Sequence, residues 1–461
     1  MRSLMKNDKD TGYTIAGRIE RLPWNSFYTR LVILLSIGEF FELYDLFVGG
    51  FVVLPISKYF HVPLVTSIYY TVAILFLGAF VGAIVFTIIG DAWGRRTALL
   101  FNLALMSAAY LAIPFAPNIV TLGALRFIAG LGIGPEALIV IDILTTEFFP
   151  AKFRGRALST AYTIAWLAPI VVAGLAYALL PYKYFGLYGW QWLFIIGGMG
   201  ILLALPFRFL IPESPRWLEV HGRKAEADAV VAKIESIARR EKGELPEPPR
   251  LEVVESKRIP FSELFNKEYR KRTIMLWIFE FLQAGVYYAF ASLAPSVLYA
   301  KGFTIVKTLE YTFIIYTSYF LSSVISILII DSVKFDRKWQ TALIMLLMGI
   351  DGLAFGYSVT PLEVVVTGFI FGLLSNIFSN AYHQYGAELY PTRVRAFADG
   401  VQYSLSRLGT YIWLTVLPLV LMLYGPVGMY AVVLVMTIIV FIDVAILGPR
   451  ASQITLENLS K

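Results

Sequence analysis

The chain has 461 residues, of which 58% are hydrophobic and only 15% are charged. This balance lies far outside the range of soluble globular proteins and predicts an integral membrane protein. Lys and Arg give a formal net charge of +7, but they are spread over loop ends and form no single patch, which argues against a nucleic-acid-binding protein.

Twelve long apolar runs recur between short polar segments, each close to the ~20 residues that a helix needs to cross ~30 Å of hydrocarbon. Because lipid leaves irregular backbone without hydrogen-bond partners, these runs predict membrane-spanning helices. Six precede a long polar segment and six follow it. Their ranges are 31–56, 67–89, 97–114, 120–147, 157–180, 190–211, 271–298, 308–330, 340–358, 363–388, 397–424 and 428–447.

We therefore expect an all-α membrane protein with twelve transmembrane helices in two six-helix pseudo-repeats. The polar segment is too short and too poor in apolar residues to hold much of a core of its own, so we expect it to join and latch the two halves. The expected segments are an N-terminal lead-in with one short surface helix (1–30), an N-terminal six-helix bundle (31–211), a linker with short helices (212–270), a C-terminal six-helix bundle (271–447) and a C-terminal tail (448–461).

Lys and Arg also predict the orientation of the helices. With both termini inside, most of them lie in cytoplasmic segments, and the exceptions outside are Lys58, Lys183, Lys301 and Lys307. The positive-inside rule thus places both termini in the cytoplasm of a cell-membrane protein. No cleavable signal peptide is expected, because residues 1–30 are polar and the first apolar run is too long for one.

The first predicted helix has three carboxylates inside its apolar run, Glu39, Glu42 and Asp45. At 100° per residue they fall within an arc of about 120°, so one face of this helix is acidic. A charge at mid-bilayer costs at least ~2.5–3.5 kcal/mol on insertion scales, which indicates an interior and functional face. Glu39 and Glu42 lie near the cytoplasmic end, where capping of polar contacts is the alternative, whereas Asp45 lies deeper.

The loop after the second predicted helix reads Gly90-Asp91-Ala92-Trp93-Gly94-Arg95-Arg96. Its glycines allow a tight reversal, and Asp91 and the guanidinium groups can form charge-assisted contacts with neighbouring helix ends. The string resembles the signature loop of the major facilitator superfamily. That resemblance implies that Gly90, Asp91, Gly94, Arg95 and Arg96 belong to a gate, which holds the two halves together when the cavity opens outward, and that they do not bind substrate.

The fourth predicted helix contains Arg126, Glu136 and Asp142, with alternate glycines that let neighbouring helices approach closely. At 1.5 Å per residue the depths of Arg126 and Asp45 are compatible, so the two can pair. An acid on the first helix that faces an Arg on the fourth resembles the proton-coupled sugar porters. By that resemblance Asp45 and Arg126 couple proton movement, and Glu136 and Glu42 are the next candidates. For Asp142 we favour a role as partner of the gating charges.

Charged motifs of the first half recur half a chain later, which indicates an internal repeat of the kind found in many transporters. We expect each set to form a charge network that is made in the outward-open state. The matched positions are Glu147 with Glu388, Arg154 with Arg395, Asp91 with Asp331, and the Arg95 region with Arg337.

The sixth predicted helix is followed by Pro212-Glu213-Ser214-Pro215-Arg216-Trp217-Leu218. Chemically this is a proline-fixed turn that presents one acid and one base at the cytoplasmic surface. The heptapeptide closely resembles the sugar-porter signature at the same place and is the most family-specific string in the sequence. Glu213 and Arg216 are therefore assigned to the gate as well.

Polar side chains concentrate in the seventh, tenth and eleventh predicted helices, too densely for lipid-facing surfaces. Gln283, Tyr287 and Tyr288 resemble the sugar-porter pattern, although the second Gln and the Asn of that pattern are missing. The deep Arg407 needs a carboxylate partner or an anionic substrate, and with Glu136 it resembles the organic-ion and synaptic-vesicle-like branch of the superfamily. The residues expected to bind substrate are Gln283, Tyr287, Tyr288, Asn376, Asn380, Tyr403 and Arg407.

The favoured function is alternating-access transport of a small polar organic solute, a sugar or a sugar acid, by proton symport. Within transport the alternatives are a uniporter, an organic-anion or phosphate transporter, or an exporter of the same superfamily. From another class, the chain could be a transporter-like solute sensor, but the linker is short and no effector domain is attached.

An enzyme is not expected, because the sequence has no nucleophile–base set and no phosphate-binding loop. The absence of Cys excludes disulfides, iron–sulfur clusters and thiol catalysis. His61, His221 and His383 are scattered and lack metal-ligand spacing. We expect no cofactor, no metal and no nucleic acid. The expected partners are the substrate, protons and the lipid bilayer, with the monomer as the working unit.

Overall fold

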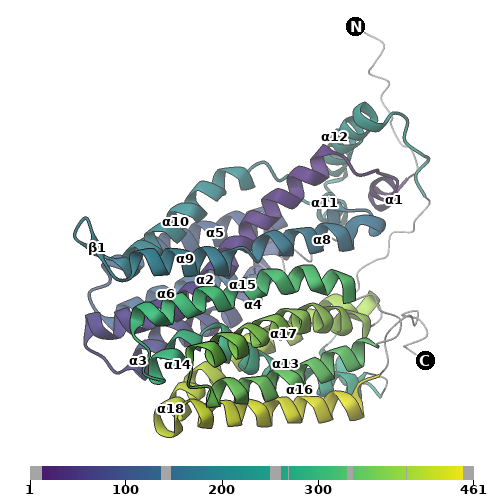
Figure 1. Ribbon diagram of the computed structural model, residues 1–461. Helices are drawn as coiled ribbons and strands as arrows, with labels where there is room; N and C mark the ends of the chain where they lie inside the picture. The colour runs from purple at the N-terminus through teal and green to yellow at the C-terminus, as the bar shows by residue number, and fades with distance from the viewer. Residues whose placement is uncertain are drawn as a thin grey trace.

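The computed structural model describes residues 13–135, 147–249, 261–267, 269–329, 336–390 and 392–449. They form a bundle of long helices in which the N-terminal half lies above the C-terminal half in Figure 1. A small antiparallel hairpin, β1 (Lys183–Tyr184) and β2 (Leu187–Tyr188), lies at the end of the bundle that we call the hairpin end. The opposite end, which we call the linker end, has the short polar helices α1 (Ile15–Glu20), α11 (Pro215–Val220) and α12 (Lys224–Lys242).

The six predicted helices of the N-terminal half are present as helices within the described residues. The second of them is built from three consecutive helical segments, the middle one of which is π-helical. The elements are α2 (Ser26–Phe60), α3 (Leu64–Ile68), η1 (Tyr69–Ala73), α4 (Ile74–Trp93), α5 (Arg95–Ala112), η2 (Ile113–Phe115), α6 (Ile119–Pro135), α8 (Ala151–Ala165), α9 (Ala168–Leu179) and α10 (Gly189–Arg208).

The C-terminal half repeats this plan with helices of similar length. A short 3-10 helix, η4 (Phe261–Phe265), precedes it. The elements are α13 (Arg270–Ala291), α14 (Ala294–Ala300), α15 (Ile305–Ile329), α16 (Arg337–Tyr357), α17 (Pro361–Glu388) and α18 (Thr392–Leu447). The eleventh and twelfth predicted helices form the single element α18, in which Gly425 has a φ of 69° and marks the turn between them.

The fifth and seventh predicted helices are each divided in two, which the apolar runs did not indicate. Pro169 stands in the first turn of α9, and Pro295 stands in the first turn of α14. Because proline has no N–H, it cannot continue the hydrogen-bond ladder of the helix before it, and it fits the start of a new helix. The two breaks therefore follow from single residues.

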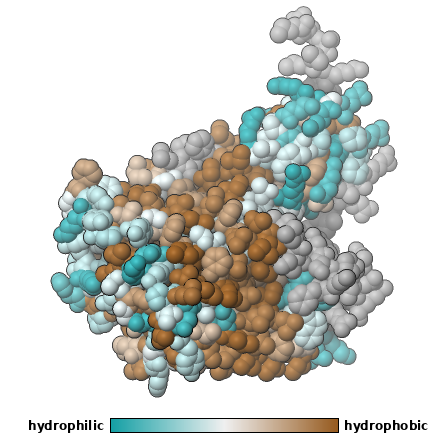
Figure 2. Space-filling view, viewed as in Figure 1, coloured by the Kyte–Doolittle hydropathy of each residue, from teal (hydrophilic) through white to brown (hydrophobic). Residues whose placement is uncertain are grey.

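The surface of the bundle is apolar in its middle. Figure 2 shows hydrophobic side chains over the centre of this face and hydrophilic ones toward the hairpin end and around α12. Large apolar side chains such as Ile88 and Leu423 are 63% and 67% exposed. Within the described ranges, seven helical segments are long and apolar enough to cross a membrane by length and composition. Such a belt of exposed apolar side chains fits contact with lipid instead of water.

Glycines allow α4 and α6 to pack with their backbones in contact. A Cβ added at Gly78 would lie 2.1 Å from the carbonyl oxygen of Phe127, and one at Gly134 would lie 2.0 Å from that of Ala79. Contacts this short are impossible for any larger residue, so the alternate glycines of the fourth predicted helix serve helix packing. The close approach fixes the position of Arg126 on α6 relative to the second helix.

The N-terminal helix α1 is clamped to the linker helix α12. Arg18 forms ion pairs with Asp228 and Glu235 at 2.7 and 2.8 Å, and Arg21 forms one with Glu235 at 2.6 Å. Ile19 packs beneath these pairs in a small apolar cluster with residues of α11 and α12. Burial raises the pKa of Glu235, but the hydrogen bonds from the two guanidinium groups outweigh it and hold the pKa below its ordinary value.

We predict that Glu235→Gln releases α1 from α12. The variant loses two partly buried ion pairs, which should weaken the free energy of docking α1 on α12 by about 2 kcal/mol. The population of the released helix should then rise by at least about tenfold. Limited trypsin digestion of the purified protein at neutral pH, followed by mass spectrometry, should show faster cleavage after Arg18 and Arg21.

The matched control is Glu226→Gln, because Glu226 is exposed and its ion pair with Arg223 lies within α12 and its cap. It should leave the cleavage rate unchanged. Acid should act on the wild type as the substitution does, since a carboxylate with a depressed pKa stabilises the fold at neutral pH and loses this contribution as the pH falls through that pKa. Equal cleavage of wild type and Glu235→Gln would contradict the clamp.

Candidate functional site

The two bundles meet along α2, in the half of the membrane nearer the hairpin end. The Phe47 ring packs edge to face against the rings of Tyr316 and Tyr319, with distances between ring centres of 5.1 and 5.3 Å. Trp166 of the N-terminal bundle stacks on Tyr319 at 5.5 Å. Further along α2, Gly50 lies so close to the C-cap of α13 that a Cβ would be 2.4 Å from the carbonyl oxygen of Ser292. The bundles are therefore closed toward the hairpin end.

A fully buried ion pair lies inside the N-terminal bundle, next to this closed region. Arg126 of α6 donates to Asp45 of α2, and both side chains are completely inaccessible to solvent. The Arg126 Nε also donates to the Thr71 carbonyl oxygen at 2.7 Å. Thr71 belongs to the π-helical segment η1, where the ordinary helical hydrogen-bond ladder is interrupted. The rings of Tyr110 and Phe194 complete the enclosure of the guanidinium.

A second buried ion pair joins the two bundles. The Nη2 of Arg407 on α18 lies 3.5 Å from the Oε1 of Glu42 on α2. The same guanidinium donates to the hydroxyl of Tyr288 at 2.7 Å and to that of Tyr403. Sequence reasoning put Glu42 with the proton-coupling residues and Arg407 with the substrate-binding residues. The structure brings them together in one cluster.

The other residues expected to bind substrate lie in different surroundings. Asn376 is fully buried and donates to the Tyr319 carbonyl oxygen at 2.7 Å, so it fastens α17 to α15. Gln283 donates at 2.7 Å to Glu280, an acid one turn earlier on α13 that was not among the expected site residues. Asn380 is partly exposed, one turn from Asn376 toward the linker end. Tyr287 is 9% exposed and joins the aromatic contacts around Tyr319.

Most of the gate charges of the N-terminal half form one network at the linker end. Arg95 pairs with Asp91 at 2.5 Å and with Glu147 at 3.4 Å. Glu213 accepts the backbone N–H of Arg95 at 2.9 Å and so caps the start of α5. The Trp217 indole donates to the Asp91 carbonyl oxygen at 3.0 Å. The signature loop and the heptapeptide are thus two parts of one structure.

Gly94 allows this network to form. Its φ is 102°, which only glycine adopts readily, and a Cβ there would lie 2.2 Å from Oε2 of Glu213. Gly90 is buried within α4, one turn before. Arg96 turns away from the network and donates to the Phe209 carbonyl oxygen at 3.1 Å.

Arg154 differs from the sequence prediction, which placed it in one network with Asp91, Arg95 and Glu147. Its Nη2 lies 2.9 Å from Oε1 of Glu20 on α1, and the same oxygen lies 3.5 Å from Nη2 of Arg216. Burial and the neighbouring Arg154 lower the pKa of Arg216. Glu20 was not predicted, because the N-terminal segment has no pattern that points to the gate.

Several predicted site residues cannot be placed. Glu136, Asp142 and Asp331 lie outside the described residues, and so do the side chains of Glu388 and Arg395. Arg337 begins α16, one residue after the Asp336 cap. The predicted mirror network of the C-terminal half therefore stays a prediction.

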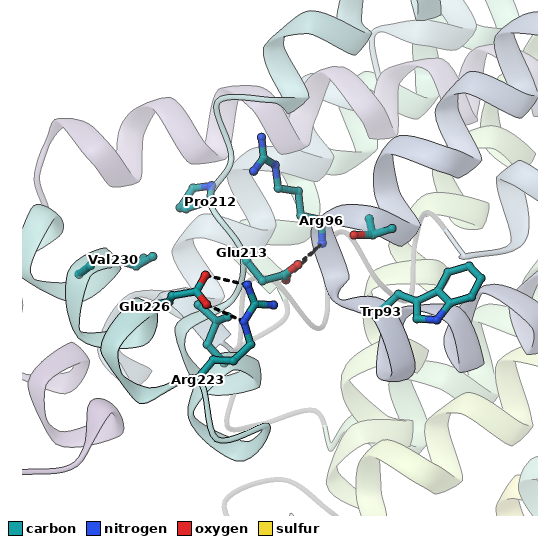
Figure 3. Close-up of a pocket in the computed structure, with 10 residues that line it drawn as sticks. Trp93, Arg96, Pro212, Glu213, Arg223, Glu226 and Val230 are labelled. Atoms are coloured by element: carbon teal, nitrogen blue, oxygen red, sulfur yellow. Dashed lines mark hydrogen bonds and ion pairs between the residues drawn. The ribbon is translucent and has the colours of Figure 1, made fainter.

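A surface pocket of about 460 Å³ lies beside the gate network, between α5 and α12. Figure 3 shows Glu213 pointing to the start of α5 on one side, with Arg223 and Glu226 paired on the other. It lies at the linker end of the N-terminal bundle and contains neither buried ion pair. The pocket therefore lies among the predicted gate charges. In the part of the chain that the structure describes, no group of three or more His, Asp or Glu is placed to hold a metal ion.

Comparison with known proteins fits this geometry. The family model described as "Sugar (and other) transporter" matches residues 31–461. The chain belongs to this family of major facilitator transporters. It is therefore a multi-pass membrane transporter and not an enzyme. The twelve-helix fold that the sequence predicted is confirmed.

Two relatives of this transporter align over most of its length. It is 32% identical to the "Putative metabolite transport protein YyaJ" of Bacillus subtilis, over 85% of this chain and 86% of that one. It is 27% identical to the "Niacin transporter NiaP" of Acinetobacter baylyi, over 96% and 99%. The partially occluded inward-open xylose transporter XylE of E. coli superposes with a TM-score of 0.76 over 93% of this chain and 100% of that one. At 17% identity this likeness shows the fold alone.

For the gate of this transporter we predict that Gly94→Ala is destabilising. The new Cβ would displace the Glu213 carboxylate and strain the backbone, at a cost of about 1–3 kcal/mol. Thermal unfolding of the purified protein should show a melting temperature lowered by several degrees.

Gly155→Ala is the control, since Gly155 lies in a helix with nothing within 4 Å of an added Cβ. It should be neutral or stabilising, because alanine favours helix over glycine. Equal effects of the two substitutions would count against a special role for Gly94.

For the tenth helix we predict that Asn376 stabilises the fold and that Asn380 does not. Asn376→Ala removes a buried hydrogen bond and leaves a small cavity, which should cost about 1–2 kcal/mol and lower the melting temperature in the absence of any solute. Asn380→Ala should leave the melting temperature nearly unchanged, because the side chain is partly exposed and free to contact solute. An unchanged melting temperature for Asn376→Ala would contradict the fastening role.

Proposed function

We propose that this transporter is a proton-coupled symporter of a small polar organic solute, a sugar or a sugar acid, that works by alternating access. The observation that carries the proposal is the Asp45–Arg126 ion pair, buried without solvent contact in a membrane bundle. A buried pair gives little net stability compared with apolar packing, so an isolated pair at this depth favours a functional explanation.

In this proposal the proton resides on Asp45 for part of the cycle. When Asp45 is ionised it holds Arg126, and when it is protonated the pair loses its Coulomb attraction. Arg126 then keeps the Thr71 carbonyl oxygen, which lies on the interrupted π-helical turn of the second helix. A helix held by one such contact can shift more easily than one held by a full ion pair. Protonation would thus be linked to movement of α2 along the bundle interface.

The arrangement of the bundles supports alternating access. The aromatic contacts close the interface toward the hairpin end, whereas the gate charges at the linker end pair within the N-terminal bundle. We take the linker end as cytoplasmic, since most Lys and Arg of the loops lie there, so that both termini are cytoplasmic in the cell membrane. The solved structure titled a D-xylose-proton symporter has the same fold.

A second candidate function is transport of an organic anion, which Arg407 favours. Its guanidinium is buried between the bundles, close to the partly exposed Tyr288 and Tyr403. A cation in such a place suits a solute that bears a carboxylate. The relative named as a niacin transporter fits this candidate, since niacin is a small carboxylic acid. A sugar acid would satisfy both candidates. We propose that the monomer is the working unit, because both ion pairs lie within one chain.

We predict that Asp45→Asn abolishes uphill accumulation of solute driven by a pH gradient, while counterflow exchange persists. The amide is neutral at all pH values and mimics only the protonated state. Both activities should be measured on the same reconstituted preparation, with exchange within about threefold of wild type and gradient-driven uptake at background.

Glu310→Gln serves as the control, because Glu310 forms an exposed ion pair with Lys307 on α15. It should retain both activities. If Asp45 only fastens two helices, Asp45→Asn should instead lose both activities together with stability. Continued uphill accumulation by Asp45→Asn would move the proton to Glu42 or Glu136, and accumulation by all three neutralised variants would favour uniport.

A further inference from the structure

The hairpin of β1 and β2 carries an exposed aromatic ring in a strained position. Its two turn residues, Phe185 and Gly186, have positive φ angles of 51° and 81°. Such a turn suits Asn or Asp followed by Gly, because other side chains are disfavoured in the left-handed region. The Phe185 ring centre lies 6.0 Å from that of Trp192, yet the residue is 94% exposed. Neither backbone conformation nor packing within the chain explains a phenylalanine at this position.

The hairpin is held against the N-terminal bundle. The Trp192 indole on α10 donates to the Tyr184 carbonyl oxygen at 3.0 Å, and the Tyr184 hydroxyl donates to the Ala178 carbonyl oxygen on α9 at 3.3 Å. On the second strand, the Tyr188 ring packs against that of Tyr59 near the end of α2, with ring centres 5.1 Å apart. These contacts hold both strands, so the turn between them projects from the bundle (Figure 1).

The side chains around the turn are of the kind that membrane–water interfaces favour. Tyr182 and Tyr188 are 62% and 38% exposed. The ammonium group of Lys183 lies 3.7 Å from the centre of the Tyr188 ring. Tyrosine and lysine combine an apolar body with a polar tip, so they are stable where hydrocarbon meets lipid headgroups. The tip of the hairpin therefore has an apolar ring with an amphipathic border.

The hairpin also continues the apolar belt of the bundle. It joins α9 and α10, and large hydrophobic side chains face outward on both helices. Tyr177 near the end of α9 is 46% exposed, and Ile196 and Met199 on α10 are 36% and 44% exposed. The belt fits contact with lipid. The hairpin thus begins where the lipid-facing surface of these two helices ends.

The C-terminal bundle has a counterpart at the same end. The turn at Gly425 in α18 follows Leu423 and Tyr424, which are 67% and 72% exposed. It joins the last two helices of its bundle, as the hairpin does in the N-terminal bundle. Figure 1 shows the two connections on opposite sides of the molecule. A protein bound to one side would leave the other uncovered, whereas a bilayer surrounds both, so the arrangement favours lipid as the partner.

We propose that the β1–β2 hairpin, Lys183–Tyr188, is a membrane-interface anchor whose Phe185 side chain inserts among the phospholipids of the leaflet at the hairpin end. The ring then leaves water, while Lys183 and the neighbouring tyrosines contact the headgroups. Burial of the ring in lipid offsets the strain of the turn. The anchor is independent of the solute and of proton coupling, because it lies outside both buried ion pairs.

The first test uses the absence of Cys from the chain. Phe185→Cys gives the protein a single thiol, which is labelled with an NBD fluorophore and reconstituted in vesicles of phosphatidylethanolamine and phosphatidylglycerol. The comparison is Ser236→Cys with the same label, because Ser236 is exposed on the polar helix α12. Lipids with a nitroxide near the glycerol should quench the Phe185→Cys label at least about twofold more strongly, and iodide in the water should show the reverse order.

The second test needs no label and depends on the sign of a change. Phe185→Asn fits the turn better but removes the ring, so in the same lipids the melting temperature should fall by a few degrees. Phe185→Trp keeps an interfacial ring and should match the wild type. The matched control is His61→Asn, since His61 is exposed, polar and the other non-glycine residue with positive φ in the described ranges. It should leave the melting temperature unchanged or raise it.

Three outcomes overturn the anchor. Iodide can quench the Phe185→Cys label as strongly as the Ser236→Cys label, which would place the tip of the hairpin in water. Neither quencher can reach the label, which would indicate that a protein partner or a second copy of the chain covers the hairpin. Phe185→Asn can leave the melting temperature unchanged or raise it, as expected for relief of strain at a ring that has no partner.

Discussion

The constraint on which the rest of this structure depends is that a charge inside a membrane bundle must find an opposite charge there. A buried charge without a partner is costly, so each of the two buried cations has an acid beside it. Arg126 and Asp45 satisfy the constraint within one bundle, and Arg407 and Glu42 satisfy it between two. The first pair can persist while the bundles move, whereas the second cannot. In the proposed mechanism, this difference separates the group that would store a proton from a contact that breaks when the bundles part.

The two ends of the molecule are built from different chemistry. Toward the hairpin end the halves touch through aromatic rings and through backbone at Gly50, contacts with little directional preference. At the linker end, Arg95, Glu147 and Glu213 form directional contacts that have only one good arrangement. Apolar contacts between the bundles can separate and re-form at a low cost in free energy. A network of ion pairs, by contrast, is either formed or broken. The combination suits a molecule that must alternate between two conformations.

The sequence was informative where local periodicity and depth decide the answer. Apolar run length predicted the helices, and depth along the bilayer made a pair of Asp45 with Arg126 conceivable. The sequence did not predict how the two bundles pack against each other, because periodicity describes each helix separately. It therefore assigned Glu42 and Arg407 to different tasks. Asn376 and Asn380 look alike in sequence because their helical spacing places them on one face of the helix. The spacing does not predict which neighbouring residue each side chain contacts. Glu20 lies in a polar segment without periodicity, where only the folded structure brings it to Arg154.

Glu20 also ties the N-terminal segment to the gate. Its carboxylate lies between two guanidinium groups, Arg154 on α8 and Arg216 on α11, and accepts the N–H of Ala151 at the start of α8. Because α1 is six residues long and begins at Ile15, a protein or affinity tag fused ahead of it would attach to a helix that contacts the gate charges. The choice of terminus for a reporter therefore decides whether the label sits beside the Glu20 carboxylate.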